Sequence, residues 1–218
     1  MASRFPKTHL IATLAGLLSA CMAAPVDYAP FRQHLPRSIL VLPPLNNSTA
    51  VDAPYVYLST VSRPLGECGY YVYPVAVIDA LMKENGLPTP DEMHTVPLEK
   101  IREIIGADAV LYVVIEDWGQ KYQIVQSTTV VKARATLVDV ATGTTLWTGT
   151  AEAAEGSGGG GDPIAMVVAA LIDQVVDSML DAPHALCATA NAAMVSNQQT
   201  GLLLGPRHPD HDADPRGR

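Results

Sequence analysis

Charged residues are scarce in this chain of 218 residues, and the basic ones form no cluster. Only 17% of the residues are Asp, Glu, Lys or Arg, and the formal net charge is −8. A negative chain without a basic patch repels phosphate backbones and anionic headgroups. The composition therefore argues against nucleic acid as a partner.

Motifs for catalysis are also missing. The chain has no G-x-S-x-G nucleophile elbow, and its six histidines show no spacing that ties them to a nucleophile. Glu116 and Asp117 are adjacent, so in an extended segment they point to opposite faces and cannot work as a paired acid and base. The sequence predicts no catalytic residues, and therefore no enzyme.

The sequence contains only weak motifs for a cofactor or metal site. Residues 156–161 contain the G-x-G-x-x-G pattern, but the strand before it is the second arm of a predicted hairpin and no P-loop lysine follows. We interpret this glycine run as a linker. The His and Asp residues between His208 and Asp214 lie in a predicted loose tail, where nothing would orient them around a metal. We expect no cofactor and no metal site.

No apolar run near the N-terminus is long enough to cross a membrane. Residues 10–18 are uncharged and apolar, whereas a spanning helix needs about 20 such residues. Arg4 and Lys7 precede the run, which is typical of an export signal. Cleavage after residue 20 would remove both charges and leave the mature chain at −10.

The export signal ends in Leu18-Ser19-Ala20-Cys21, which resembles a bacterial lipobox. In proteins with that box the cysteine thiol receives a diacylglycerol and the new amino terminus is acylated, with chains such as palmitate. Several chains together hold a domain on a bilayer, because each buried methylene contributes about 0.8 kcal/mol. We predict lipidation of Cys21. Met22 replaces the aspartate that retains some lipoproteins at the inner membrane, so the resemblance implies the outer membrane, with the domain facing the periplasm.

Two cysteines remain once Cys21 carries lipid. Cys68 and Cys187 would meet an oxidising compartment after export, where a pair can be bridged. We predict a disulfide between them. The alternative is two separate buried thiols, since a bridge requires Cα atoms within about 7 Å of each other.

The order of predicted elements indicates one α/β domain, a mixed β-sheet with helices packed on it. Residues 1–20 are the signal peptide, 21–37 a proline-rich tether, 38–204 the domain and 205–218 a disordered tail. Residues 88–90 are expected to form a stiff loop, and residues 116–121 a connection between strands. Hydrophobic periodicity predicts strands at 39–42, 70–73, 109–115, 122–140 and 144–154, and helices at 51–65, 75–85, 97–105, 163–180 and 183–197.

Tyrosines occur in two closely spaced groups. Packing against a core uses only part of each group, and tyrosine is favoured at protein contacts. We single out Tyr55, Tyr57 and Tyr70 as partner-binding residues. The alternative is that most of them belong to the core.

Several segments together resemble a family of bacterial lipoproteins of the neisserial surface-antigen type: residues 38–46, 69–75, 83–87, 106–112 and 201–207. Residues 137–147 are also similar to the N-terminal α/β domain of TolB and to related outer-membrane lipoproteins, among them an activator of peptidoglycan synthase and the curli secretion lipoprotein. The resemblance implies a TolB-like fold and a non-enzymatic envelope protein.

The sequence is compatible with three functions. The first is a lipid-tethered adaptor for envelope assembly or secretion, whose exposed edge strand and tyrosines bind an envelope partner or a second copy in a homodimer. The resemblance implies a secretion lipoprotein of the curli type as such a partner. The alternative is a periplasmic module that holds a small molecule or lipid between helices and sheet. A cell-wall hydrolase is a distant third.

Overall fold

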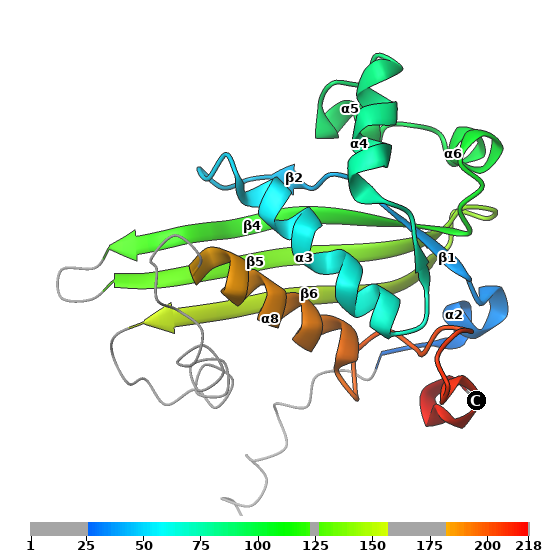
Figure 1. The fold of residues 1–218 in the computed structure, drawn as a ribbon. Coiled ribbons are helices and arrows are strands. Elements are labelled where there is room, and N and C mark those ends of the chain that lie inside the picture. Colours follow the sequence, from blue (N-terminus) through cyan, green and yellow to red (C-terminus); the bar gives the residue numbers. More distant parts are fainter. Residues whose placement is uncertain (1–25, 123–126, 157–181, 218) are drawn as a thin grey trace, which may run out of the picture.

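The fold is built on a mixed sheet of six strands, which confirms the predicted α/β class. The computed structural model describes residues 26–122, 127–156 and 182–217. Across the sheet the strands run in the order β3 (Tyr71–Val72), β1 (Ser38–Val41), β4 (Ala109–Tyr122), β5 (Ser127–Asp139) and β6 (Thr145–Gly156), while the short β2 (Leu45–Asn46) pairs with β4 beyond β1. The first three are parallel, and β4, β5 and β6 form an antiparallel meander (Figure 1).

Strand β1 separates two hydrophobic cores. All four of its residues are buried, because both faces of the sheet are covered at this point. Ile39 and Val41 join the larger core, while Leu40 and the following Leu42 join the smaller one. Alternation of side chains along a strand thus sends one apolar run into both layers.

Two helices cover one face of the meander. α3 (Ala53–Glu67) and α8 (Ala182–Ser196) lie side by side on β4, β5 and β6 and form the larger core (Figure 1). Three short helices, α4 (Val75–Glu84), α5 (Pro90–His94) and α6 (Leu98–Ile104), enclose the smaller core beside β1. The helices predicted at 51–65, 75–85, 97–105 and 183–197 are therefore confirmed, and the one predicted at 163–180 lies outside the described residues.

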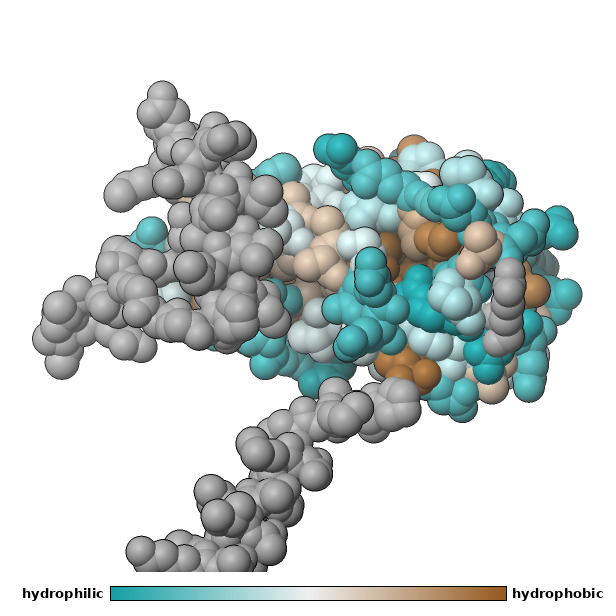
Figure 2. Space-filling model, turned by 90° about the horizontal axis from the view of Figure 1, so that it is seen from below, coloured by the Kyte–Doolittle hydropathy of each residue, from teal (hydrophilic) through white to brown (hydrophobic). Residues whose placement is uncertain are grey.

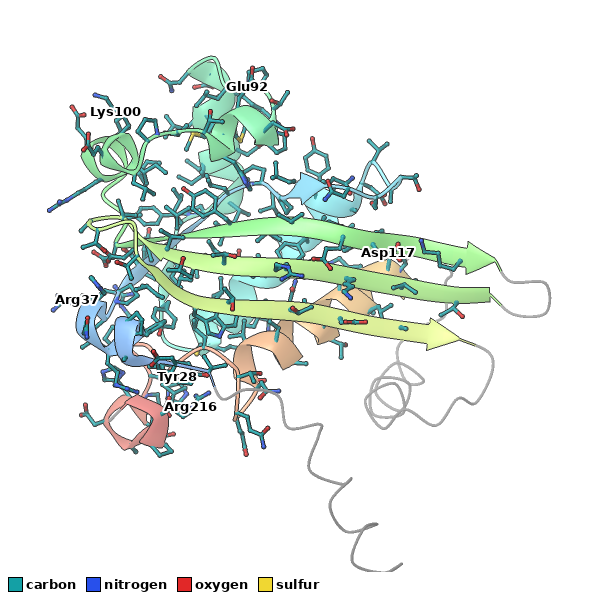
Figure 3. The ribbon with its side chains drawn as sticks, turned by 180° about the vertical axis from the view of Figure 1, so that it is seen from behind. Tyr28, Arg37, Glu92, Lys100, Asp117 and Arg216 are labelled. Atoms are coloured by element: carbon teal, nitrogen blue, oxygen red, sulfur yellow. The ribbon has the colours of Figure 1, made fainter. Side chains whose placement is uncertain are left out.

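The opposite face of the meander carries polar side chains. Glu116 and Arg134 form an ion pair of 2.9 Å across β4 and β5, and Lys132 faces Glu152 at 3.5 Å across β5 and β6. No helix in the described ranges covers this face (Figure 3). An antiparallel sheet with one solvated face explains the alternation of Val, Ala and Leu with Lys, Arg and Thr in β5.

One local prediction was wrong. Residues 116–121 are not a connection, because β4 continues to Tyr122 through a β-bulge between Ile115 and Asp117.

The stiff loop predicted at 88–90 is followed directly by a helix that was not predicted. Pro88 and Thr89 lie outside helices and strands, but Pro90 begins α5, whose N-terminus is closed by a capping box between Thr89 and Glu92.

The segment before the domain is shorter than predicted. Residues 26–37 are not an irregular tether, since they contain α2 (Ala29–His34), whose Phe31 is fully buried in the larger core. Tyr28 donates a hydrogen bond of 2.6 Å to the carbonyl of Gly201. Burial of two aromatic side chains therefore fixes this segment to the domain.

The predicted disordered tail was also wrong for residues 205–217. This segment forms two 3₁₀ turns, η1 (His211–Ala213) and η2 (Pro215–Gly217), beside α2 (Figure 1). Arg216 holds it in place: its guanidinium pairs with Asp214 at 3.0 Å, donates to the carbonyls of Asn197 and Leu202, and lies 5.9 Å from the ring centre of Tyr28. We call the region where residues 26–37 and 205–217 meet the terminal end.

Candidate functional site

The two cysteines that the structure describes are both buried and both free, so the predicted disulfide was wrong. The Sγ of Cys187 lies 3.2 Å from Oγ1 of Thr60 in the middle of α3, whereas Cys68 follows the last residue of that helix. Eight residues of helix correspond to about 12 Å, well beyond the span of a disulfide. Burial raises the pKa of each thiol to about 11. Cys21 lies outside the described residues, and its lipidation stays a prediction.

The three predicted partner-binding tyrosines do not share a surface. Tyr57 is completely buried between α3 and its neighbours, and Tyr70 is buried with its hydroxyl donating 2.6 Å to the carbonyl of Leu203. Burial raises the pKa of both phenols. Only Tyr55 is exposed, with 62% of its surface accessible and Lys83 at 5.9 Å from its ring. The core alternative therefore holds for Tyr57 and Tyr70.

Two adjoining cavities occupy the terminal end. One, of about 440 Å³, lies between α2 and the C-terminal segment and is lined by Tyr70, Leu204 and Pro206. The other, of about 700 Å³, lies where α2, α6 and the β5–β6 turn meet, and we call it the polar groove. Leu35 and Arg37 line both. The cavities therefore meet at these two residues.

Leu35 combines a left-handed backbone conformation with an exposed apolar side chain. Its φ of 40° is the only positive value for a residue other than glycine in the described ranges. This left-handed conformation ends α2 and is costly for a residue with a branched side chain. The side chain is nonetheless 52% exposed, at the junction of the two cavities. Strain of this kind, held in place by its surroundings, is common at ligand sites.

Basic and acidic side chains line the polar groove. Arg37 and Arg102 line it, together with His34, whose Nδ1 lies 3.5 Å from Oδ2 of Asp139. Figure 3 shows Arg37 at the same end of the molecule as Tyr28 and Arg216. Asp108 accepts hydrogen bonds from the backbone N–H groups of Arg37 and Ser38 and from the Ser38 hydroxyl.

Strand β6 is an edge of the sheet, and its outer side is the second candidate surface. It pairs with β5 along its length, and no other strand in the described parts of the chain neighbours it. Alternate residues of such a strand direct N–H and C=O groups away from the sheet. We call this side the β6 edge. Thr148 and Thr150, both exposed, stand on the polar face beside it.

The surface around these features is mostly hydrophilic. Figure 2 shows small, separate hydrophobic spots among hydrophilic residues on the visible side of the described part. No group of three or more His, Cys, Asp or Glu residues within the described ranges could hold a metal ion. In the same ranges, no helix combines the length and hydrophobicity needed to cross a membrane.

No local sequence pattern predicts the polar groove. Arg37 and Arg102 are 65 positions apart and belong to no motif, and only the parallel pairing of β1 with β4 brings their segments together. The exposed edge strand, in contrast, follows from the predicted hairpin at the end of the sheet.

Comparisons with known proteins agree with this architecture. A family model described as "Putative lipoprotein GNA1162-like" matches residues 26–207. The "Putative lipoprotein NMB1124/NMB1162" of Neisseria meningitidis serogroup B is 40% identical over 203 residues, which cover 91% of this chain and 94% of that protein. The crystal structure of lipoprotein GNA1162 from Neisseria meningitidis is similar with a TM-score of 0.55 and 42% identity, covering 66% of this chain and all of that one.

Proposed function

Because the chain belongs to the GNA1162-like lipoprotein family, we propose that it is a lipid-anchored adaptor of the outer membrane that faces the periplasm. In this proposal Cys21 carries the lipid, and the β6 edge binds an extended segment of an envelope protein that acts in assembly or secretion. The protein catalyses no reaction.

The position of the first described residues supports an anchor close to the domain. Val26 is five positions after Cys21, and an extended chain advances at most about 3.6 Å per residue. The anchor would therefore hold the terminal end within about 18 Å of the membrane surface. Tyr28 and Phe31 fix the chain to the domain directly after this short segment.

The free edge of β6 is the observation that carries the adaptor role. Twelve residues form this strand, and α2 packs against part of it. None of the twelve is Pro, Lys or Arg, residues that commonly protect an edge from pairing. No backbone hydrogen bond between described residues occupies the edge. Such an edge can accept one more strand from another chain through main-chain hydrogen bonds. Tyr55 lies in the first turn of α3 beside Lys83 and is not part of this edge.

Two observations support the absence of catalysis. The described thiols are protonated at neutral pH, because burial raises the pKa of each to about 11. His94, which is partly buried, has its Nε2 2.9 Å from the carbonyl of Pro43 rather than near a nucleophile, and burial lowers its pKa.

Fractionation and cross-linking test the proposal with four forms of the full-length protein. We expect the wild type to sediment with outer membranes and to capture one envelope protein, and Cys21→Ala to remain soluble. Thr148→Lys places a long cation at the edge, so it should sediment normally but lose the capture. Thr136→Lys is the matched control, because Thr136 is the register partner of Thr148 on the same face of β5.

Separate outcomes overturn the two parts of the proposal. Sedimentation of Cys21→Ala with the membranes contradicts the lipid anchor. Undiminished capture by Thr148→Lys, or equal loss with Thr136→Lys, contradicts binding at the β6 edge. Capture of a second copy in place of a different protein identifies the homodimer as the paired state.

A further inference from the structure

We infer that the polar groove binds an oxyanion, the carboxylate or phosphate group of a small ligand, through the guanidinium groups of Arg37 and Arg102. This inference is independent of the lipid anchor and of the β6 edge. It rests on unused hydrogen-bond donors, on satisfied carboxylates and on the strained residue that joins the groove to the neighbouring cavity.

Cations elsewhere in the described structure have partners. Ion pairs shorter than 4 Å join carboxylates to Arg63, Lys83, Lys100, Lys121, Lys132, Arg134 and Arg216. Arg32 donates to the carbonyl of Arg216, and Arg207 lies 5.5 Å from the ring centre of Tyr71. Among the Lys and Arg side chains of the described ranges, only those of Arg37 and Arg102 form no ion pair, hydrogen bond or ring contact; both are exposed and line the polar groove.

Neither carboxylate of the groove forms an ion pair or hydrogen bond with the guanidinium group of Arg37 or Arg102. Oδ2 of Asp108 accepts three hydrogen bonds of 2.9 to 3.0 Å from Arg37 N–H, Ser38 N–H and the Ser38 hydroxyl. Oδ2 of Asp139 accepts two of 2.8 Å from the N–H and hydroxyl of Thr142 and also faces His34. Both carboxylates thus hold the chain turns that form the walls, and neither forms an ion pair or hydrogen bond with the guanidinium groups of Arg37 and Arg102.

Guanidinium groups match an oxyanion in both charge and geometry. Each presents five N–H donors in a planar fork that suits the paired oxygens of carboxylate or phosphate. Arg37 and Arg102 both line a groove of about 700 Å³, within the range of small-molecule sites. An oxyanion supplies the acceptors that both arginines lack.

The neighbouring cavity indicates an apolar part of the ligand next to the oxyanion. Leu35, strained and half exposed, stands at the junction, and Tyr70, Leu204 and Pro206 line the space beyond it. His211 and Asp214 also line that space, and Asp214 is paired with Arg216. The structure therefore favours a ligand with one oxyanion and a short apolar extension.

Calorimetric titration of the full-length, detergent-solubilised protein tests this inference with three probes: acetate, valerate and inorganic phosphate. We expect saturable binding of at least one probe that weakens as salt is added. Arg37→Gln and Arg102→Gln should each weaken it at least tenfold, and Arg63→Gln, which changes an exposed arginine on α3, should alter it less than twofold. Thermal unfolding of each variant confirms that it is folded.

The probes also distinguish the two sources of an oxyanion. Valerate binding more tightly than acetate and phosphate assigns a carboxylate with an apolar extension, and tightest binding of phosphate assigns a phosphate ester. The inference is overturned if no probe binds saturably, or if Arg63→Gln weakens binding as much as Arg37→Gln. Because no membrane or protein partner is present, such a failure leaves the adaptor proposal untouched.

Discussion

Several polar side chains are completely buried in the layer between α3 and α8. Asn191 donates from Nδ2 to Thr60 Oγ1 at 2.9 Å and approaches the Sγ of Cys187 at 3.5 Å. The hydroxyl of Tyr57 and Oδ1 of Asn191 have no hydrogen-bond partner among the described residues. Unsatisfied buried groups of this kind cost about 1–3 kcal/mol each. This layer therefore stabilises the fold through packing rather than through its polar contacts.

The buried thiols lead to a first prediction. In the native protein, Cys68 and Cys187 should not react with a thiol reagent near neutral pH, because both are buried and burial raises the pKa of each to about 11. After unfolding in denaturant without reductant, both should react. Titration with Ellman's reagent measures the two states. A disulfide would leave both residues unreactive even after unfolding.

A second prediction concerns Gly149 in β6. A Cβ at this position would lie 2.3 Å from the Trp147 ring and 2.9 Å from Met194 of α8. Gly149→Ala should therefore lower the free energy of unfolding by about 1–3 kcal/mol, because strand and helix must separate.

Gly66 near the end of α3 provides the matched control for this change. A Cβ there meets nothing within 4 Å, and the glycine has no positive φ. Gly66→Ala should raise the free energy of unfolding by about 0.4–1 kcal/mol. Urea unfolding of both variants gives these values. Equal changes in the free energy of unfolding would contradict the close packing at Gly149.

At the scale of elements, local sequence predicts the strands and helices that carry strong hydrophobic patterns. The run at Ile39 and the hairpin around Gly143 were correctly predicted, since apolar clustering and turn residues act over a few positions. The capping box of Thr89 and Glu92 is present in the sequence, but the prolines on both sides of Thr89 favour a loop, so α5 was not predicted. Strand β4 continues beyond Ile115 because pairing with β5, a tertiary contact, outweighs the polar local sequence.

The C-terminal segment shows why composition alone misjudged order. Residues 205–217 bury little apolar surface of their own, which predicts disorder. Their order comes from contacts distant in sequence: Gly205 N–H donates 2.7 Å to the carbonyl of Cys68, and Arg207 N–H donates to that of Gly69. The absence of a Cβ at Gly69 and Gly205 permits this close approach. Such pairings, like the presence of Arg37 and Arg102 in one groove, depend on the fold and leave no local pattern.

A third prediction follows for Asp214 in this segment. Burial alone would raise the pKa of this carboxyl, but hydrogen bonds and charge from Arg216 outweigh it and lower the pKa. Because the pKa of Asp214 is lower in the folded protein than its unfolded value of about 3.9, the ionised carboxylate stabilises the folded state at pH values above about 3.9. This stabilisation is lost as the pH falls through the folded pKa. Asp214→Asn should therefore cost about 1–3 kcal/mol at pH 7 and progressively less below pH 4.

Urea unfolding at pH 7 and at pH 3 measures that difference. Asp210→Asn is the control, because Asp210 is exposed in the same segment and should change stability little at either pH. An Asp214→Asn cost that stays constant between the two pH values would contradict the role given to Arg216.

At the scale of the whole molecule, the proposed anchor and the β6 edge serve different purposes. The terminal end joins residues 26–37 to residues 205–217 through Tyr28 and Arg216, so a lipid at Cys21 would fix the orientation of the entire domain. The β6 edge borders the polar sheet face (Figure 3), while α3 and α8 cover the other face. A partner strand could therefore add to the sheet without disturbing either core.

Site-specific photo-cross-linking in cells tests whether the β6 edge binds a partner strand. A benzoylphenylalanine is placed in the full-length chain either at Thr150 of the edge strand β6 or at Thr136 of the adjacent strand β5. Binding at the β6 edge should give one covalent adduct of defined mass from position 150 and little from position 136. No adduct from position 150, or equal adducts from both positions, would contradict it.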